Sequence, residues 1–262
     1  MIKAIFLDID GTLVSFETKS IPASTIEALR EAKARGVKIF IATGRPVAFI
    51  NNLGAIESLS LIDGYVTMNG SYCYVGDEVV FSNPMARSEV LKVSDYCEQQ
   101  GVACVYVGER RVTVRNSSEI YRHLFVDMLH VGYVSEVSLE EALSYEIFQL
   151  SPFVHKSDEG ELISMLEGCE VGRWMDDFAD IGAEGNTKSL GISKMIERFG
   201  IDVSEVMAIG DGGNDISMLS YAGVGVAMGN ASDEVKSYAD YVTTSVDEGG
   251  IACALRHYGL LG

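Results

Sequence analysis

The sequence predicts an α/β protein, a doubly wound parallel sheet with an α+β domain inserted between its two halves. Apolar runs typical of buried strands alternate with helical segments in the first and last thirds of the 262-residue chain, which is the pattern of β-α-β units. Between these thirds the pattern changes to paired strands around short turns, which favours an antiparallel sheet. The length is sufficient for two domains, and a hydrophobic content of 47% is ample for their cores.

The first third begins with the apolar run Ala4–Leu7, which we expect to be a buried strand. A helix should follow it, with Ser20 as its cap, Pro22 in its first turn and Gly36 at its end. The other elements expected here are a strand at 37–42, a short helix around 46–53 and a strand at 64–68. This succession predicts that the strands are parallel neighbours.

The pattern changes near residue 72, where strands at 72–75 and 79–81 flank a Gly76-Asp77 turn and predict a hairpin. The elements expected after it are a helix at 85–101, paired strands at 102–107 and 111–115, a helix at 118–129, a strand at 145–150, a helix at 159–166 and strands at 171–175 and 178–181. We therefore place the inserted α+β domain at residues 83–182 and the core domain at residues 1–82 and 183–262.

The last third returns to the α/β pattern. Its expected elements are helices at 187–199, 216–221, 232–239 and 249–258, and strands at 206–209, 224–227 and 241–242. The strand at 206–209 leads into a turn of glycines and acidic or amide residues, Gly210-Asp211-Gly212-Gly213-Asn214-Asp215.

Composition excludes several classes of function. A net charge of -18 would repel nucleic acid and anionic membranes, and any phosphate site would have to be locally positive. The five cysteines include no C-x-x-C pair, so neither a disulfide framework nor a structural zinc site is expected. The sequence shows no signal peptide and no apolar stretch of membrane-spanning length. We expect a cytoplasmic protein that binds neither nucleic acid nor membrane.

The most informative motif is Asp8-Ile9-Asp10-Gly11-Thr12, which directly follows the first strand. Two carboxylates two residues apart point the same way if the extended backbone continues. Buried carboxylates are costly unless a cation or strong hydrogen bonds compensate them, so the motif indicates a divalent metal and phosphate chemistry. The simpler interpretation is a polar turn after a core strand.

Three further elements stand at strand ends or a helix start, where open α/β sheets place their sites. They are Thr43 after the second strand, Lys188 at the start of a helix, and the 210–215 turn. Each has a simpler explanation when taken alone, because threonine often serves as a turn hydroxyl and an early helical lysine is often solvated. The order of the four elements is what makes the pattern informative.

This order resembles the haloacid dehalogenase superfamily of phosphohydrolases, and the insertion between the threonine and lysine elements resembles its Cof-type subfamily with a C2 cap. The resemblance extends over essentially the whole chain and implies a Rossmann-like core. The lysine of this subfamily is commonly followed by glycine, whereas Ser189 follows Lys188, and Asn186 and Thr187 also depart from the usual pattern. Lys194 is the alternative lysine, almost two helical turns further along.

The resemblance implies that Asp8 attacks phosphorus and forms an aspartyl-phosphate, while Asp10 acts as general acid and then as general base. It also implies Mg²⁺, bound by the carboxylates of Asp8 and Asp211 and by the backbone carbonyl of Asp10. A cation is needed because a carboxylate at ~4 Å from a phosphate dianion meets about 4 kcal/mol of repulsion for each pair of unit charges, at an effective dielectric constant of about 20.

The same resemblance assigns the phosphate contacts. Thr43 and the Gly44 N–H hold phosphoryl oxygens, and Lys188 neutralises the charge that develops on them. Asn214 contacts the phosphate or Lys188, and Asp215 orients the metal surroundings through water.

The resulting hypothesis is a Mg²⁺-dependent phosphomonoesterase that acts on small phosphorylated metabolites, with sugar phosphates favoured by the resemblance. A phosphomutase on the same scaffold is one alternative, and a phosphorylatable signalling domain or a non-hydrolytic sensor is another. Two-component receiver domains also place acidic residues, threonine and lysine around Mg²⁺, but they are much shorter. A catalytically inactive sensor is disfavoured because every expected catalytic residue type is present.

Overall fold

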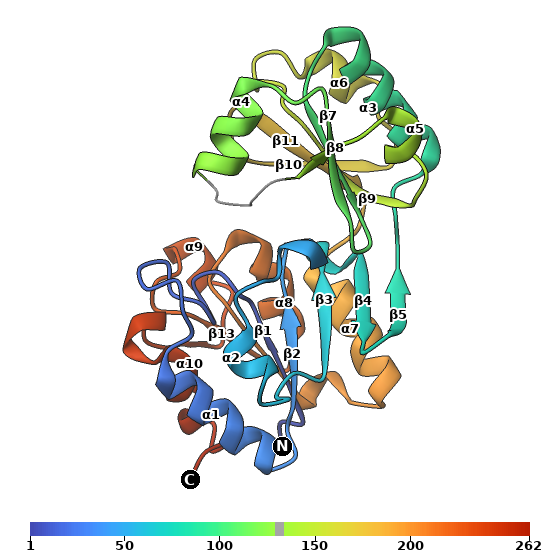
Figure 1. Cartoon of the computed structure of the whole chain (residues 1–262). Coiled ribbons are helices and arrows are strands. Elements are labelled where there is room, and N and C mark those ends of the chain that lie inside the picture. Colours follow the sequence, from blue (N-terminus) through green and yellow to red (C-terminus); the bar gives the residue numbers. More distant parts are fainter. Residues whose placement is uncertain (129–133) are drawn as a thin grey trace. The chain divides into compact units, whose positions relative to one another are not determined.

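The computed structural model describes residues 1–128 and 134–262 (Figure 1). Its internal contacts divide the chain into two compact units. The core unit comprises Met1–Arg45, Ile50–Ser82 and Thr187–Gly262, and the inserted unit comprises Pro46–Phe49 and Asn83–Asn186. Within the described residues, no helix combines the length and the apolar character needed to cross a bilayer.

The core unit contains one sheet of eight strands, in the order β14-β13-β12-β1-β2-β3-β4-β5. Six of them run parallel, and β4 and β5 form an antiparallel hairpin at one edge. The strands are β1 (Ala4–Leu7), β2 (Lys38–Ala42), β3 (Gly64–Thr67), β4 (Tyr72–Val75), β5 (Glu78–Ser82), β12 (Val206–Gly210), β13 (Val224–Ala227) and β14 (Tyr241–Val242). Because β1 lies between β2 and β12, the loops after these three strands meet at one edge of the sheet.

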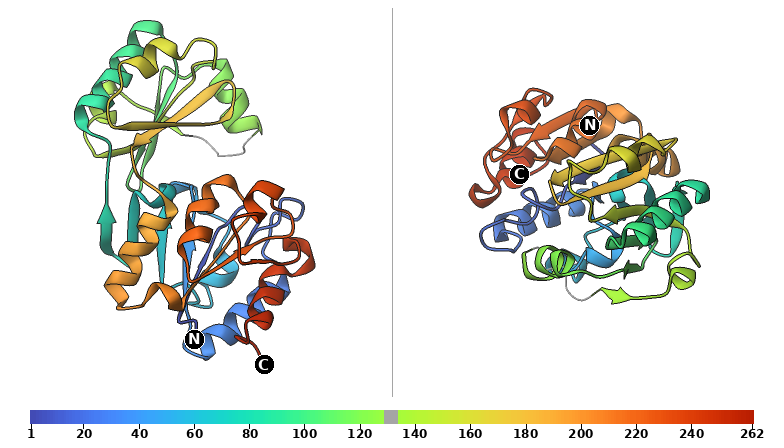
Figure 2. Two further views of the ribbon diagram at one scale, coloured as in Figure 1. Left: turned by 180° about the vertical axis from the view of Figure 1, so that it is seen from behind. Right: turned by 90° about the horizontal axis from the view of Figure 1, so that it is seen from above.

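Helices cover both faces of this sheet, as Figures 1 and 2 show. The helical elements of the unit are α1 (Ala23–Ala34), α2 (Gly54–Glu57), η2 (Met68–Gly70), α7 (Lys188–Phe199), η4 (Val203–Glu205), η5 (Gly213–Asp215), α8 (Ile216–Tyr221), α9 (Asp233–Lys236), η6 (Val246–Glu248) and α10 (Gly250–His257). Ile5 and Leu7 of β1 pack with α1 and α10, whereas Phe6 packs with α7 and α8. Both faces of β1 are therefore buried, which explains why its sequence is uniformly apolar.

The inserted unit is built on a second sheet of six strands, in the order β10-β11-β9-β6-β7-β8. Its neighbours are antiparallel except β7 and β8, which are parallel. The strands are β6 (Cys104–Gly108), β7 (Val112–Arg115), β8 (Ser135–Glu136), β9 (Ile147–Pro152), β10 (Cys169–Met175) and β11 (Phe178–Ala183). The helical elements are η1 (Val47–Phe49), α3 (Arg87–Gln100), α4 (Glu119–Tyr121), η3 (Arg122–Met128), α5 (Leu139–Ala142) and α6 (Gly160–Ser164).

The predicted fold class is confirmed, and most of the expected elements are present within a few residues of their expected bounds. Ser20 was expected to cap α1, but the helix begins after Pro22 without any side-chain cap, because the fixed backbone angle of proline already suits a helix start. The helix expected at 118–129 is divided into α4 and η3, and Leu129 lies outside the described residues. The short elements β8 and α5 were missed, since two and four residues carry no readable periodicity.

Helix α7 begins at Lys188 because the residue before it caps the helix. The Thr187 hydroxyl accepts a hydrogen bond from the backbone N–H of Leu190 at 3.2 Å. Thr187 departs from the pattern of the resembled subfamily, yet threonine is a favoured cap and fixes where the first turn starts. The cap therefore sets the position of Lys188 in the first turn of α7.

Replacement of Thr187 by alanine should lower the free energy of unfolding by about 1 kcal/mol, because the Leu190 N–H loses its partner. Thr187→Ser keeps the hydroxyl and should retain most of the wild-type stability. Urea denaturation followed by circular dichroism measures both. Equal midpoints for Thr187→Ala and the wild type would show that the cap has no energetic role.

Candidate active site

Three aspartates from two neighbouring strand ends form the centre of the site. Asp8 follows β1, and Asp211 and Asp215 follow β12, the parallel neighbour of β1. One carboxylate oxygen of each lies within 4.8 Å of the others. The structure thus brings together residues that are about two hundred positions apart in the sequence.

Lys188 neutralises part of this acidic cluster. Its Nζ lies 2.6 Å from Asp8 Oδ1 and 2.5 Å from Asp215 Oδ1, and its side chain is completely buried. The alternative lysine, Lys194, lies 3.7 Å from Glu197 on the outer side of α7 and does not contact the cluster. When all three carboxylates are ionised, the single ammonium leaves two negative charges uncompensated. A divalent cation with a preference for oxygen ligands, such as Mg²⁺, fits both that charge and these donors.

Burial changes the acidity of these groups. It raises the pKa of Asp8 to about 8, and the charge of Asp215 adds to this effect while Lys188 opposes it. Burial also raises the pKa of Asp211 to about 6, against a hydrogen bond from Thr12 that lowers it. For Lys188, burial alone lowers the pKa, but the charges of Asp215 and Asp8 outweigh burial and hold the pKa above its usual value. The lysine is therefore a permanent cation between two carboxyl groups.

The Asp211 carboxylate is held from both sides. The Thr12 hydroxyl donates to Oδ1 at 2.8 Å, and the Asn230 amide donates to Oδ2 at 3.1 Å. Gly11 has a φ of +82°, and a Cβ there would lie 2.2 Å from Asp211 Oδ2. Both the backbone angle and the close approach of Asp211 therefore require glycine at this position. Sequence reasoning included Thr12 in its motif but assigned it no role, and it missed Asn230, which no motif spacing connects to Asp211.

Asp10 lies in the same loop as Asp8, but its side chain has another partner. Arg45 donates Nε–H to Asp10 Oδ2 at 2.7 Å and Nη2–H to Oδ1 at 2.6 Å. Sequence reasoning did not identify Arg45 as the partner of Asp10. Arg45 follows the Thr43-Gly44 pair after β2, and the planar guanidinium matches a carboxylate in this two-bond geometry.

Thr43 and Gly44 occupy the loop after β2, beside two amide side chains. The Asn214 amide donates to Asn69 Oδ1 at 3.0 Å, and Gly44 lies against both asparagines. Asn214 was expected to contact the phosphate or Lys188; in the structure its amide binds Asn69, and the hydrogen bonds of Lys188 among the described residues go to Asp8 and Asp215. Asn69 is a further residue that sequence reasoning missed, and its φ of 52° shows that a left-handed backbone presents its side chain to Asn214.

The Asp215 carboxylate has three protein donors that sequence reasoning did not identify. It accepts hydrogen bonds from Lys188 and from the backbone N–H groups of Asp211, at 2.9 Å, and Gly212, at 2.8 Å. The side chain is completely buried. Asp215 therefore fixes both the lysine and the backbone that carries Asp211.

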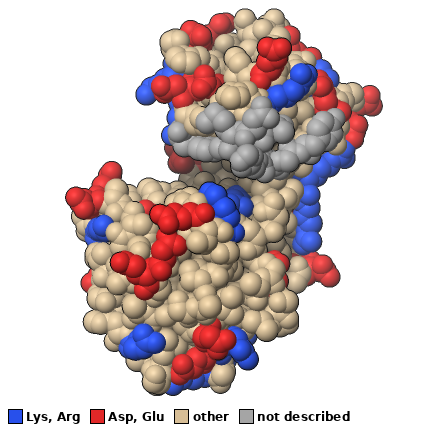
Figure 3. All heavy atoms as spheres, turned by 60° about the vertical axis from the view of Figure 1, so that its left-hand side comes forward, with Lys and Arg blue, Asp and Glu red and all other residues tan. Residues whose placement is uncertain are grey.

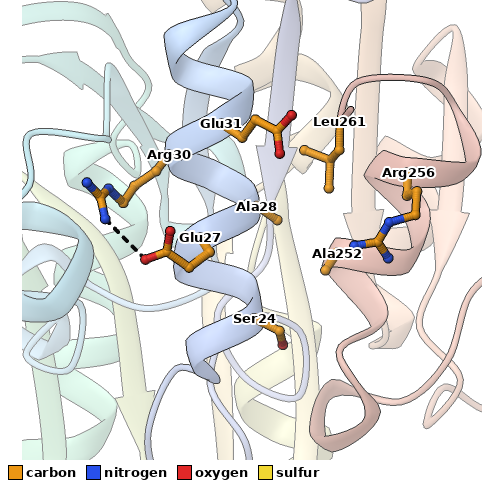
Figure 4. Close-up of a pocket in the computed structure, with 8 residues that line it drawn as sticks. All are labelled: Ser24, Glu27, Ala28, Arg30, Glu31, Ala252, Arg256 and Leu261. Atoms are coloured by element: carbon orange, nitrogen blue, oxygen red, sulfur yellow. Dashed lines mark hydrogen bonds and ion pairs between the residues drawn. The ribbon is translucent and has the colours of Figure 1, made fainter.

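A hollow of about 480 Å³ lies between α1 and α10, and residues of the acidic cluster do not line it (Figure 4). Its acidic side chains already have partners, since Glu27 contacts Arg30 at 3.1 Å and Glu31 contacts Arg35 at 2.6 Å. We therefore place the chemistry at the strand ends.

The charge of the chain makes local cations necessary for binding an anion. The net charge is -18, and the face of the core unit shown in Figure 3 carries separate acidic and basic patches. Long-range electrostatics thus oppose the approach of an anion, and an anion site on this chain would require positive charge at close range.

Comparisons with known proteins agree with this geometry. The family model of haloacid dehalogenase-like hydrolases matches residues 5–255. The putative phosphatase YkrA of Bacillus subtilis (strain 168) is 33% identical over 261 residues, which is 99% of this chain and 98% of that protein. The pyridoxal phosphate phosphatase YbhA of Escherichia coli (strain K12) is 29% identical over 255 residues, or 92% of each chain. Among solved structures, the subclass IIB sugar phosphatase BT4131 is 51% identical with a TM-score of 0.88, covering 99% of this chain and 100% of that one.

The chain belongs to the haloacid dehalogenase-like hydrolase family. The family predicted from the order of the four sequence elements is confirmed, and so is the predicted enzyme class, a hydrolase of that family.

Without a metal, the protein should lose stability as the pH rises. The ordinary aspartate pKa is 3.8, whereas folding raises the pKa of Asp8 to about 8 and that of Asp211 to about 6. Between these values the folded state holds protons that the unfolded state has released, so the free energy of unfolding falls by up to about 1.4 kcal/mol per pH unit for each carboxyl group.

Thermal melts in EDTA between about pH 5 and pH 8 measure this slope. Asp8→Asn should flatten it, and Mg²⁺ should raise the melting temperature most at the alkaline end, where both carboxylates are ionised. A melting temperature that increases with pH in EDTA would contradict the charge assignment.

Proposed function

We propose that this phosphatase hydrolyses phosphomonoesters of small metabolites, sugar phosphates in particular, with Asp8 as nucleophile and Mg²⁺ as cofactor. The observation that supports the proposal is the acidic cluster of Asp8, Asp211 and Asp215 around the buried Lys188 ammonium, with two negative charges left over. Few other chemistries require so many carboxylates at one point, since each adds repulsion that only a cation offsets.

The carboxylates of Asp8 and Asp211 and the backbone carbonyl of Asp10 are the groups that would hold Mg²⁺. Asp215 is a poorer ligand, because one of its oxygens is bound to Lys188 and the other to two backbone N–H groups. When bound, the cation offsets the repulsion between the Asp8 carboxylate and a phosphate dianion.

Asp8 would attack phosphorus with a carboxylate oxygen. The new acyl-phosphate bond between an Asp8 oxygen and phosphorus forms while the bond from phosphorus to the alkoxide leaving group breaks, and Asp10 donates a proton to that oxygen. Water then attacks the aspartyl-phosphate, Asp10 takes its proton, and inorganic phosphate leaves. Arg45 orients Asp10 by two hydrogen bonds, one to each oxygen, and one of them has to open when that oxygen carries the proton.

The transferring phosphoryl group would be held by donors on the neighbouring loops. Thr43, the Gly44 N–H and the Asn214 amide lie on neighbouring loops at this edge of the sheet and supply neutral donors. Lys188 supplies the positive charge, and its burial strengthens the interaction because water does not screen it.

Similarity supports sugar phosphates as the substrate class. The subclass IIB sugar phosphatase is 51% identical over nearly the whole chain, whereas the pyridoxal phosphate phosphatase is 29% identical. Sugar phosphates are therefore the first class to assay, in a panel that also includes pyridoxal phosphate. Residues that bind only the phosphate do not distinguish one phosphomonoester from another. Preference for one of these substrates therefore depends on other residues.

Asp8→Asn should abolish phosphate release, because an amide is not a nucleophile toward phosphorus. A loss of at least about a thousandfold in kcat is expected for removal of a covalent nucleophile. Glu27→Gln is the matched control, since it also removes one negative charge but lies in the hollow between α1 and α10. Release of inorganic phosphate from the panel with Mg²⁺ measures both.

Full turnover by Asp8→Asn would refute the nucleophile assignment. Isomerised sugar phosphate with little free phosphate would instead identify a phosphomutase. A long-lived phosphoprotein without turnover would identify a signalling protein.

A further inference from the structure

We infer that Asn230 is a positioning residue of the divalent-cation site, which sets the orientation of the Asp211 carboxylate. The inference rests on the proposed function, because it assumes that Asp211 binds Mg²⁺. Asn230 lies in the loop between β13 and α9 and does not itself belong to the acidic cluster.

The Asn230 side chain joins three separate segments. Its amide donates to the backbone carbonyl of Gly11 at 2.9 Å and to Asp211 Oδ2 at 3.1 Å. Its carbonyl oxygen accepts a hydrogen bond from the backbone N–H of Val246 at 3.0 Å. One side chain thus connects the turn after β1, the turn after β12 and the start of η6, although 219 positions separate Asn230 from Gly11.

The backbone that carries Asn230 is also fixed to the site. The Met228 N–H donates to the Gly210 carbonyl at 2.9 Å, directly before Asp211. The Gly229 N–H donates to the Thr244 carbonyl at 3.0 Å, and a Cβ on Gly229 would lie 2.6 Å from the Ser245 nitrogen. The loop therefore approaches its neighbours too closely to shift, and the Asn230 amide has a defined direction toward Asp211.

Asp211 needs such support because its neighbours repel it. The carboxylates of Asp8 and Asp215 lie within 4.8 Å, and Asp211 is less buried than either, so a free side chain could rotate toward solvent. The Thr12 hydroxyl restrains only Oδ1, so the Asp211 carboxylate could still rotate about this single hydrogen bond. Asn230 restrains Oδ2, so the two hydrogen bonds together fix the rotation of the Asp211 carboxylate. Loss of such an outer partner typically weakens metal binding by about 10- to 100-fold.

Titration calorimetry of metal-free protein with MgCl₂ tests the inference. Asn230→Ala should raise the Mg²⁺ dissociation constant by about 10-fold or more. Asn51→Ala removes an equally exposed asparagine of the core unit that lies outside the site, and it should keep the wild-type constant. In activity assays, the Mg²⁺ concentration for half-maximal rate should rise by the same factor, while kcat at saturating Mg²⁺ and KM for the phosphoester stay within about twofold.

Melting temperatures separate positioning from folding. Asn230→Ala should lower the metal-free melting temperature, because three hydrogen bonds are lost. If Asn230 positions a metal ligand, the variant also reduces the further increase in melting temperature that Mg²⁺ causes. Asn230→Ser, which also loses the reach to Asp211, should behave in the same way and replaces the alanine variant if that variant does not fold. An unchanged dissociation constant in the folded variants would overturn the inference, even if both melting temperatures fell together.

The outcome is distinguishable from failure of the proposed function. A wild-type protein that binds Mg²⁺ but releases no phosphate from any member of the panel refutes the proposed activity, and calorimetry still decides the role of Asn230. A wild-type protein that binds no Mg²⁺ overturns the inference about Asn230.

Discussion

The buried Lys188 ammonium is the interaction on which the site depends. It contacts Asp8 and Asp215 at once, and without it two carboxylates would be buried beside each other and beside Asp211 with no internal counter-charge. A lone buried charge costs several kcal/mol even after relaxation, whereas a group with well-placed partners of opposite charge is tolerated. The lysine compensates only part of the cluster, and the remaining two negative charges make the site receptive to a divalent cation.

The parallel sheet determines which groups can meet there. Because β1 lies between β2 and β12, the loops that carry Asp8, Thr43 and Asp211 emerge at the same edge. Helix α7 adds Lys188 from one face of the sheet, and the Thr187 cap determines where that helix starts. The rigid scaffold is apolar on both faces of β1, so the polar groups are confined to the strand ends.

A second set of contacts links the loops to one another. Arg45 holds Asp10, Asn69 holds Asn214, and Asn230 holds Asp211. Each pair joins two different loops, from 19 to 145 positions apart in the sequence, and each leaves the supported side chain with less rotational freedom. Orientation of this kind matters for phosphoryl transfer, because catalysis there depends mainly on placing charges and donors around the phosphorus.

The sequence by itself determined the fold class, the strands of the core sheet and the motif that contains Asp8 and Asp10, because apolar periodicity and turn residues are local signals. It also identified Lys188 in preference to Lys194 and pointed to Asp211, through the order of elements along the chain. Only the tertiary structure decided which side chains pair across loops: Arg45 with Asp10, Asp215 directly with Lys188, Asn69 with Asn214 and Asn230 with Asp211. Such pairs depend on distances between loops that strand order and packing set, and a local pattern carries no information about them.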